Sequence, residues 1–242
     1  MFSIEPVADG IYRISHVIPG QPITFNQFLV EDERPALIHT GWHSMYADVR
    51  SAIRQVLDPA RLEYIVIAHF EADECGGMRS FAAGGHAVLV CSAVGSVVNL
   101  SHWGHRGPIQ GVRDGDVLHL GRHRLRFLET PHVHQWDSLM VFEETTGSLF
   151  PADLFLQPGD QPPVVTEDLS AEMCEFYRES GIFAAPEPVL ASLRRIRTLD
   201  PEWAHPMHGG SLGRIVLPRY VDALLTRPFA FDGRVLGRWL PT

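Results

Sequence analysis

His69-Phe70-Glu71-Ala72-Asp73 is the stretch that decides the fold. It follows Tyr64 to Ala68, a short apolar run that is typical of a buried strand. In extended backbone, alternate side chains point the same way, so one imidazole and two carboxylates would converge where the strand ends. Gly76 and Gly77 then allow the chain to turn sharply. The pattern therefore predicts a metal site at a strand end, holding one ion or sharing two.

The composition is that of a folded, acidic protein. With 242 residues, of which 45% are hydrophobic, residues 1–242 are expected to form one domain with a large core. The formal charge of -9 disfavours nucleic acid and anionic membranes as partners. We see no secretory signal and no apolar run near the roughly 18 residues of a membrane span. Three sparse cysteines favour reduced thiols, and hence a cytoplasmic location.

Two halves of similar character follow one another along the chain. In the first half we expect strands over Gly10–Val17, Phe25–Glu31, Ala36–Thr40, Tyr64–Ala68 and Ala87–Cys91, and helices over Ser44–Leu57, with Ser44 as N-cap, and Met78–Ala83. In the second half we expect strands over Val117–Leu120, Arg124–Leu128, Ser138–Glu143, Ser148–Pro151 and Glu202–His205, and helices over Ala171–Ser180, Val189–Leu199 and Arg219–Leu225. This plan predicts two packed sheets with helices outside, an α/β four-layer sandwich.

Three further segments have the character of ligand loops, because each places His or Asp beside Pro or Gly at the end of a predicted element. They are Thr130–Ser138, Phe150–Asp153 and His205–Gly210. One such segment alone would be weak evidence for a metal site. Four of them are stronger, because a fold can gather strand ends at one edge.

The order of these residues resembles the diiron domain of flavodiiron proteins, within the metallo-β-lactamase superfamily. After His-x-Glu-x-Asp come a His, an Asp and a His, and Asp153 follows His134 by 19 positions, a spacing of that family. Pro131 to Ser138 is similar to the family's Pro-x-x-His-Trp-Pro-Asp-Ser segment, and His208-Gly209 to its last ligand pair. The resemblance covers nearly the whole chain and implies the metallo-β-lactamase-like αββα fold.

The resemblance also implies two iron ions joined by an oxo or hydroxo bridge. By this resemblance the ligands are His69, Glu71 and His134 for the first iron, Asp73 and His208 for the second, and Asp153 as a bridge between them. Carboxylates are hard anionic ligands that suit iron or manganese and can span two cations. In the zinc hydrolases of the superfamily a second His usually stands at the position of Glu71, so this residue favours iron.

Some positions remain open at this stage. Glu74 departs from the family, which usually has His there; Glu74 could bind the second iron or point away from it. His132 competes with His134, and His205 with His208. His39 is a candidate for an outer position near the site mouth or for a proton donor. Other open residues are Cys75, as a ligand or a small buried residue, and His102 and His105, as a lid or a surface loop.

Two functions follow from the resemblance. Full flavodiiron proteins continue into a flavodoxin domain, and we see no phosphate loop for FMN here, so we expect no flavodoxin domain and no FMN in this chain. The domain would bind O2 (or NO), either as an oxygen sensor or carrier or as a reductase that takes electrons from a separate redox protein. A separate signalling protein and a homodimer are further expected partners. The alternative function is a dinuclear zinc or iron-zinc hydrolase of esters or thioesters. A fold that has lost its metals is a third reading.

Overall fold

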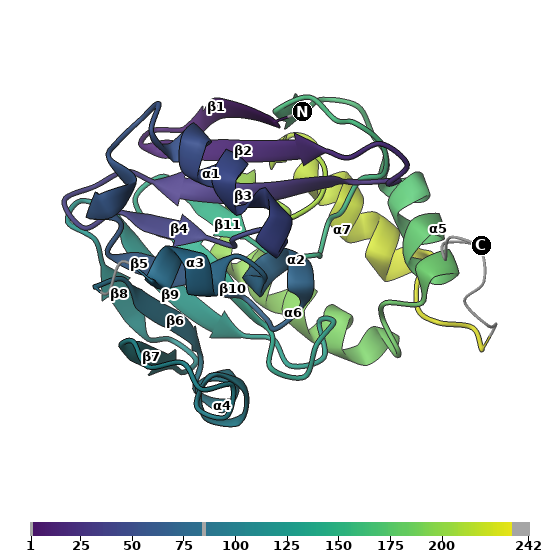
Figure 1. Cartoon of the computed structure of the whole chain (residues 1–242). Helices are drawn as coiled ribbons and strands as arrows, with labels where there is room; N and C mark the ends of the chain where they lie inside the picture. Colours follow the sequence, from purple (N-terminus) through teal and green to yellow (C-terminus); the bar gives the residue numbers. More distant parts are fainter. Residues whose placement is uncertain (1, 84–85, 234–242) are drawn as a thin grey trace.

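Two seven-stranded sheets lie at the centre of the molecule (Figure 1). The computed structural model describes residues 2–83 and 86–233. The first sheet runs in spatial order β1 (Phe2–Ala8), β2 (Ile11–Val17), β3 (Thr24–Val30), β4 (Ala36–Ile38), β5 (Tyr64–Val66), β6 (Val88–Ser92), β7 (Ile109–Val112). The second runs β12 (Val164–Val165), β14 (Ser211–Gly213), β13 (Trp203–Ala204), β11 (Ser148–Phe150), β10 (Leu139–Glu143), β9 (Arg124–Glu129), β8 (Val117–His119).

The first sheet changes from antiparallel to parallel at β4. Strands β1 to β4 pair antiparallel, whereas β4, β5, β6 and β7 pair parallel, with Ile38 opposite Val66 and Val66 opposite Val90. Parallel strands end at the same edge of a sheet. The loops that follow β4 and β5 therefore start side by side, and the second of them carries the His-x-Glu-x-Asp motif.

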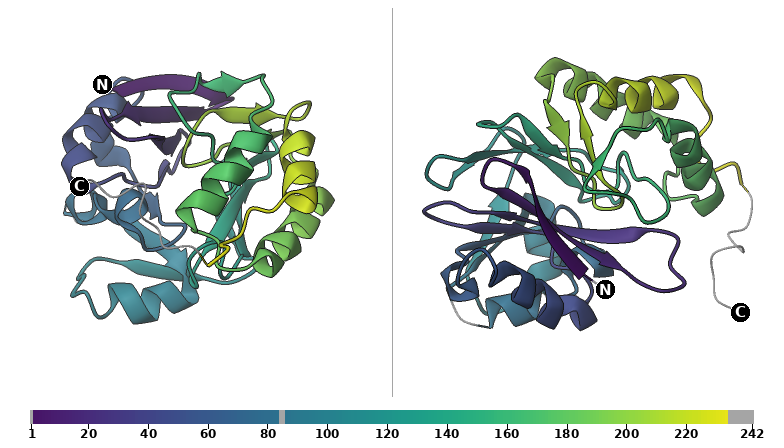
Figure 2. Two further views of the ribbon diagram at one scale, coloured as in Figure 1. Left: turned by 90° about the vertical axis from the view of Figure 1, so that its right-hand side faces the viewer. Right: turned by 90° about the horizontal axis from the view of Figure 1, so that it is seen from above.

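Helices cover the outer faces of both sheets. The first sheet carries α1 (Tyr46–Ile53), α2 (Ala72–Cys75), α3 (Met78–Ala82) and α4 (Ala93–Gly95), with the short helical turns η1 (His43–Met45), η2 (Pro59–Arg61) and η3 (Ser96–Leu100). The second carries α5 (Ser170–Ser180), α6 (Pro186–Leu199) and α7 (Leu217–Thr226). Seen from above in Figure 2, the two groups of helices lie on opposite sides of the paired sheets. None of the described helices is long and apolar enough to span a membrane.

Three apolar interfaces hold together the four layers, which are the two sheets and the two groups of helices. Between the sheets, Phe28, Val66 and Phe150 are buried in one cluster. A second cluster, which includes Tyr177 and Leu193, lies beneath α5, α6 and α7, and two smaller clusters lie beneath the helices of the first half. Apolar burial on both faces of each sheet is what the near-continuous apolar strands demand. The predicted αββα sandwich is confirmed.

Some boundaries differ from the prediction. The helix expected over residues 44–57 has its α-helical part at Tyr46–Ile53, and Ser44 is no N-cap, because it lies inside η1, which runs directly into α1. Strands β1, β7, β12 and β14 were not expected. Strand β1 is an edge strand whose residues are mostly half-buried, and β7 has two exposed residues in its middle. Strands β12 and β14 have only two and three residues. None of the four shows a long apolar run.

Candidate metal centre

The His-x-Glu-x-Asp motif is only partly extended. Strand β5 ends at Val66, and Glu71 has extended backbone with φ -124° and ψ 159°, but residues 72–75 form one helical turn, α2. Asp73 therefore reaches the site from a helix, and the alternation expected for it is wrong. The turn depends on glycine, because a Cβ at Gly76 would lie 2.4 Å from the Ala72 carbonyl oxygen and 2.8 Å from the His43 nitrogen.

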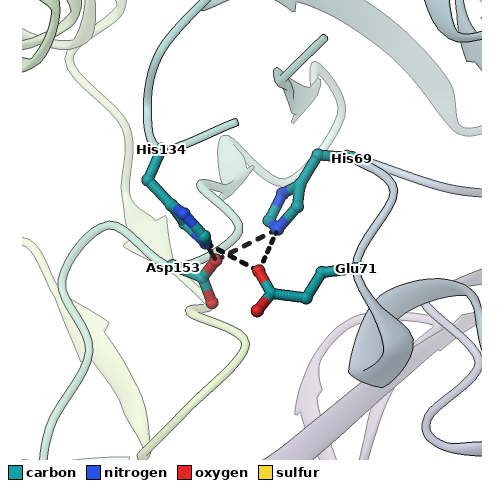
Figure 3. Close-up of side chains that lie close together, drawn as sticks. All are labelled: His69, Glu71, His134 and Asp153. Atoms are coloured by element: carbon teal, nitrogen blue, oxygen red, sulfur yellow. Dashed lines mark ion pairs between the residues drawn. The ribbon is translucent and has the colours of Figure 1, made fainter. Parts of the chain in front are cut away.

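Four side chains converge at one end of the sandwich (Figure 3). His69 and Glu71 come from the loop after β5, while His134 and Asp153 come from the loops that flank β10 and β11. His134 Nε2 lies 3.0 Å from Glu71 Oε2 and 2.9 Å from Asp153 Oδ2. His69 Nε2 lies 3.6 Å from Glu71 Oε2 and 3.3 Å from Asp153 Oδ2. One ligand atom from each of the four lies within 4.8 Å of the others, a spacing that fits one metal ion.

The other oxygen of Asp153 faces a second group. His208 Nε2 lies 3.1 Å from Asp153 Oδ1 and 3.4 Å from Asp73 Oδ2. Asp153 thus turns Oδ2 towards His69 and His134 and Oδ1 towards His208. All six residues named as ligands from the sequence are therefore brought together, with Asp153 in the middle.

A buried polar network from the N-terminal hairpin holds the His208 loop, and the sequence reasoning missed it. The His208 ring donates from Nδ1 to the Thr24 carbonyl at 2.7 Å, since a carbonyl can only accept, and this leaves Nε2 free to act as a metal ligand. Gly209 N donates to Thr24 Oγ1 at 2.9 Å, and its carbonyl accepts from Arg13 Nη2 at 2.9 Å and Asn26 Nδ2 at 2.7 Å. The signal was present as polar residues inside apolar strands.

The competing residues lie elsewhere. His132 is exposed, and His205 is buried, with ring nitrogens 2.8 Å from Ser211 Oγ and 3.1 Å from Ser148 Oγ. Cys75 is buried, and burial, followed by the Asp73 charge, raises the pKa of its thiol to about 12. The remaining candidates for a lid, His102 and His105, do not line the cavity beside the cluster.

The electrostatics show that the metal-free cluster holds protons where cations would bind. Burial disfavours the charged form of His134, but hydrogen bonds with Asp153 and Glu71 outweigh it and raise the pKa to about 10. His208 has its pKa raised to about 10 against the same burial cost by Asp153 and Asp73. The facing ring nitrogens of His134 and then His69 lower the pKa of Glu71. Both His rings are therefore positively charged at neutral pH, as counter-ions to the carboxylates.

Glu74 and His39 lie against the same cluster. Glu74 is completely buried, and burial, followed by the charges of Asp73 and Asp153, raises the pKa of its carboxyl group well above the usual value. His39 was expected near the site mouth, which is wrong, because only 1% of its surface is exposed. Burial and then the charge of His69 lower the pKa of His39 to about 3, so the ring is neutral.

A cavity of about 360 Å³ opens onto the cluster. Its apolar wall comes from the loop before β3, the loop after β11, and α5 with the turn after it. The wall residues are Pro22, Ile23, Leu156, Phe176 and Ile182, and the polar ones are Gln21, Ser180 and five of the cluster residues. No Lys or Arg lines this cavity among the described residues.

The residues fit a pair of metal ions. Both ring nitrogens of His69 and both carboxylate oxygens of Glu74 are buried without a hydrogen-bond partner, which is costly unless a ligand completes them. The donors are imidazole and carboxylate, a set that suits iron or manganese.

Comparison with known proteins agrees with this geometry. Residues 23–209 match the family model described as "ODP family beta lactamase". The chain belongs to this family. The ODP family domain is also 31% identical over 200 residues to the rubredoxin-oxygen oxidoreductase of Megalodesulfovibrio gigas, a match that covers 77% of this chain and 48% of that protein. It is 28% identical over 171 residues to the nitric oxide reductase of Moorella thermoacetica, covering 63% of this chain and 42% of that one.

Solved structures give the same fold. The structure of rubredoxin oxygen:oxidoreductase from Desulfovibrio gigas superposes with a TM-score of 0.83 at 22% identity, covering 92% of this chain and 61% of that chain. The ODP family domain spans about half the length of the curated relatives it matches. It is a metallo-β-lactamase-like domain of the flavodiiron type, related to O2 and NO reductases.

Proposed function

We propose that this domain holds two iron ions and binds O2 or NO beside them. The observation that carries the proposal is the position of Asp153, whose Oδ2 faces His69 and His134 and whose Oδ1 faces His208. A carboxylate placed in this way can bridge two cations, and a two-metal site needs such a bridge. His69, Glu71 and His134 would hold the first ion, and Asp73 and His208 the second.

Each set of side chains has a distinct task in this proposal. Two ferrous ions would supply the electrons that O2 or NO takes up. The Thr24 carbonyl fixes the His208 ring so that Nε2 points at Asp153, and the loop after β5 fixes His69 and Glu71 on the opposite side. The carboxylates offset the positive charge that would otherwise make a buried metal pair unstable.

The cavity favours a small apolar ligand. Ile23, Leu156, Phe176 and Ile182 line it beside the cluster residues, and this apolar lining suits a small uncharged ligand such as a diatomic gas. Lys or Arg would best hold the acidic group of an ester or thioester substrate, and the described lining residues include neither. We therefore prefer gas binding to hydrolysis, whether the domain serves as a sensor or carrier or as a reductase fed by a separate electron donor.

Metal analysis followed by gas titration tests the proposal. Protein purified from its native host should contain iron close to two ions per chain, and the anaerobic ferrous form should change its absorption when O2 or NO is added. A matched sample loaded with zinc should not respond to either gas. Zinc in the native protein, together with ester or thioester turnover, would overturn the proposal in favour of the hydrolase.

A further inference from the structure

Glu74 is the one completely buried carboxylate of the cluster, and the six-residue ligand set leaves it without a role. Its exposed fraction is 0%. The backbone holds it in place, because Thr40 N and Thr40 Oγ1 both donate to the Glu74 carbonyl, at 2.8 and 2.9 Å, and Glu74 N donates to the Glu71 carbonyl at 3.2 Å. The backbone at Glu74 is therefore fixed, and the side chain starts from a defined position beside the cluster.

The carboxylate of Glu74 has no hydrogen-bond partner in the protein. Neither Oε1 nor Oε2 receives a hydrogen bond, although both are buried. His69 Nε2 lies 3.2 Å from Oε1. If His69 binds the first metal through Nε2, that nitrogen has no hydrogen to donate to Glu74. The carboxylate then needs another partner.

Glu74 also shares a ligand-like arrangement with its neighbours in the chain. One oxygen from each of Glu71, Asp73 and Glu74 lies within 4.8 Å of the others; this group shares Glu71 with the group of His69, His134 and Asp153 and adds Glu74 beside Asp73. We propose that Glu74 is a ligand of the second metal ion, together with Asp73, His208 and the bridging Asp153. This assignment rests on the proposed dinuclear centre.

The charge of the site follows from this assignment. With Glu74, four carboxylates face two divalent ions, so their negative charges equal the positive charges of a ferrous pair; the others are Glu71, Asp73 and Asp153. An anionic oxygen donor stabilises the ferric state more than a neutral imidazole does. The second iron should therefore be harder to reduce than it would be with a His at position 74.

The test compares metal binding and metal-free stability in Glu74→Ala, Glu74→Gln and Glu74→His. Anaerobic Fe2+ and Mn2+ are titrated into each metal-free protein, and metal per chain and affinity are measured. Wild type should bind two ions. The Ala and Gln variants should keep the first and lose affinity for the second by about tenfold or more, since even outer partners of a metal ligand are worth that much. Glu74→His should restore the second ion, with a higher reduction potential than wild type.

Glu143 supplies a matched control, because it too is completely buried but is fully hydrogen-bonded. Its oxygens accept from Thr145 N at 2.8 Å and from Thr146 N and Oγ1 at 2.8 and 2.6 Å. Glu143→Ala should lower the stability of the metal-free protein and leave two metal ions bound. Glu74→Ala should raise or preserve the stability of the metal-free protein, because it removes an unpartnered carboxyl group, and it should weaken binding of the second metal ion.

The outcomes separate this inference from the proposed function. If wild type binds no metal pair, the proposed function fails. If wild type binds two ions and Glu74→Ala binds both with unchanged affinity, only the assignment of Glu74 fails. If Glu74→Gln binds the second ion as tightly as wild type, Glu74 acts as a neutral positioning group, and the assignment is likewise overturned.

Discussion

Replacing Tyr177 by phenylalanine is expected to weaken both the fold and the metal centre. Tyr177 lies in α5 and is completely buried, and its hydroxyl donates to the Asp153 carbonyl at 2.6 Å while accepting from Leu156 N at 2.9 Å. Both partners belong to the loop that carries the central carboxylate. The substitution leaves this carbonyl and this N–H buried without a partner.

The magnitude follows from these two bonds. At about 1–1.5 kcal/mol for each buried hydrogen bond, Tyr177→Phe should lower the free energy of unfolding by about 2–3 kcal/mol. For a domain of this size, that corresponds to a fall of about 5–10 °C in Tm. Because the Asp153 backbone is no longer anchored, metal affinity should also fall by about tenfold, as for other outer partners of ligands.

Tyr220→Phe is the matched control. Tyr220 is equally buried in α7, but its hydroxyl makes one bond, accepting from Leu169 N at 3.2 Å, away from the cluster. It should lose only about 1 kcal/mol and keep its metal affinity. Urea denaturation of both metal-free variants and anaerobic Fe2+ titration measure the two effects. Equal losses of stability in the two variants, or unchanged metal affinity in Tyr177→Phe, would refute the reasoning.

Three other expectations concern charge. Asp153→Asn should abolish the binding of a metal pair, which metal analysis of the purified variant checks, and a retained pair would contradict the bridging role. The raised pKa values of His134 and His208, about 10 against 6.5 in the unfolded chain, stabilise the metal-free protein fully below pH 6.5 and lose this effect as the pH rises towards 10. Urea denaturation of the metal-free protein should therefore show a free energy of unfolding that falls between pH 6 and 10. Metal binding displaces these protons, so the metal-loaded protein should show a weaker dependence on pH. Burial opposes ionisation of Glu143, but hydrogen bonds, first from His123, lower its pKa to about 2. Ionised Glu143 therefore contributes fully to the free energy of unfolding above pH 4.5, and this contribution is lost as the pH falls towards 2. Glu143→Gln should remove this acid dependence in denaturation measured from pH 2 to 5.

The sequence contained enough to predict the fold class, because its buried strands are continuous apolar runs. Strand β5, Tyr64–Val66, is completely buried, as the apolar stretch from residue 64 to 68 indicates. Edge strands such as β1 lack this signal, because most residues of β1 are only half-buried. Helix α2 was missed for another reason: its single turn is held by tertiary contacts with Thr40, which no local pattern contains.

The same limit applies to the candidate site. The ligand loops were visible because His, Asp and Glu stand beside Pro and Gly, and the structure brings these residues together. The direction of the Glu74 side chain was not predictable, since it depends on a turn buried against the loop after β4. Thr24 supports His208 although 184 positions separate them, so its role has no local signature.

The distribution of the site along the chain makes it a test of complete folding. His69, Glu71 and Asp73 belong to the first sheet's half of the chain, whereas His134, Asp153 and His208 belong to the second. Bringing such distant segments together costs loop-closure entropy, which is recovered only after both sheets have packed. A metal pair would therefore link the two halves of the chain. Local opening of either half would release the metal ions before the rest of the fold is lost. The metal content of a sample would then measure the fraction of molecules in which both halves are folded.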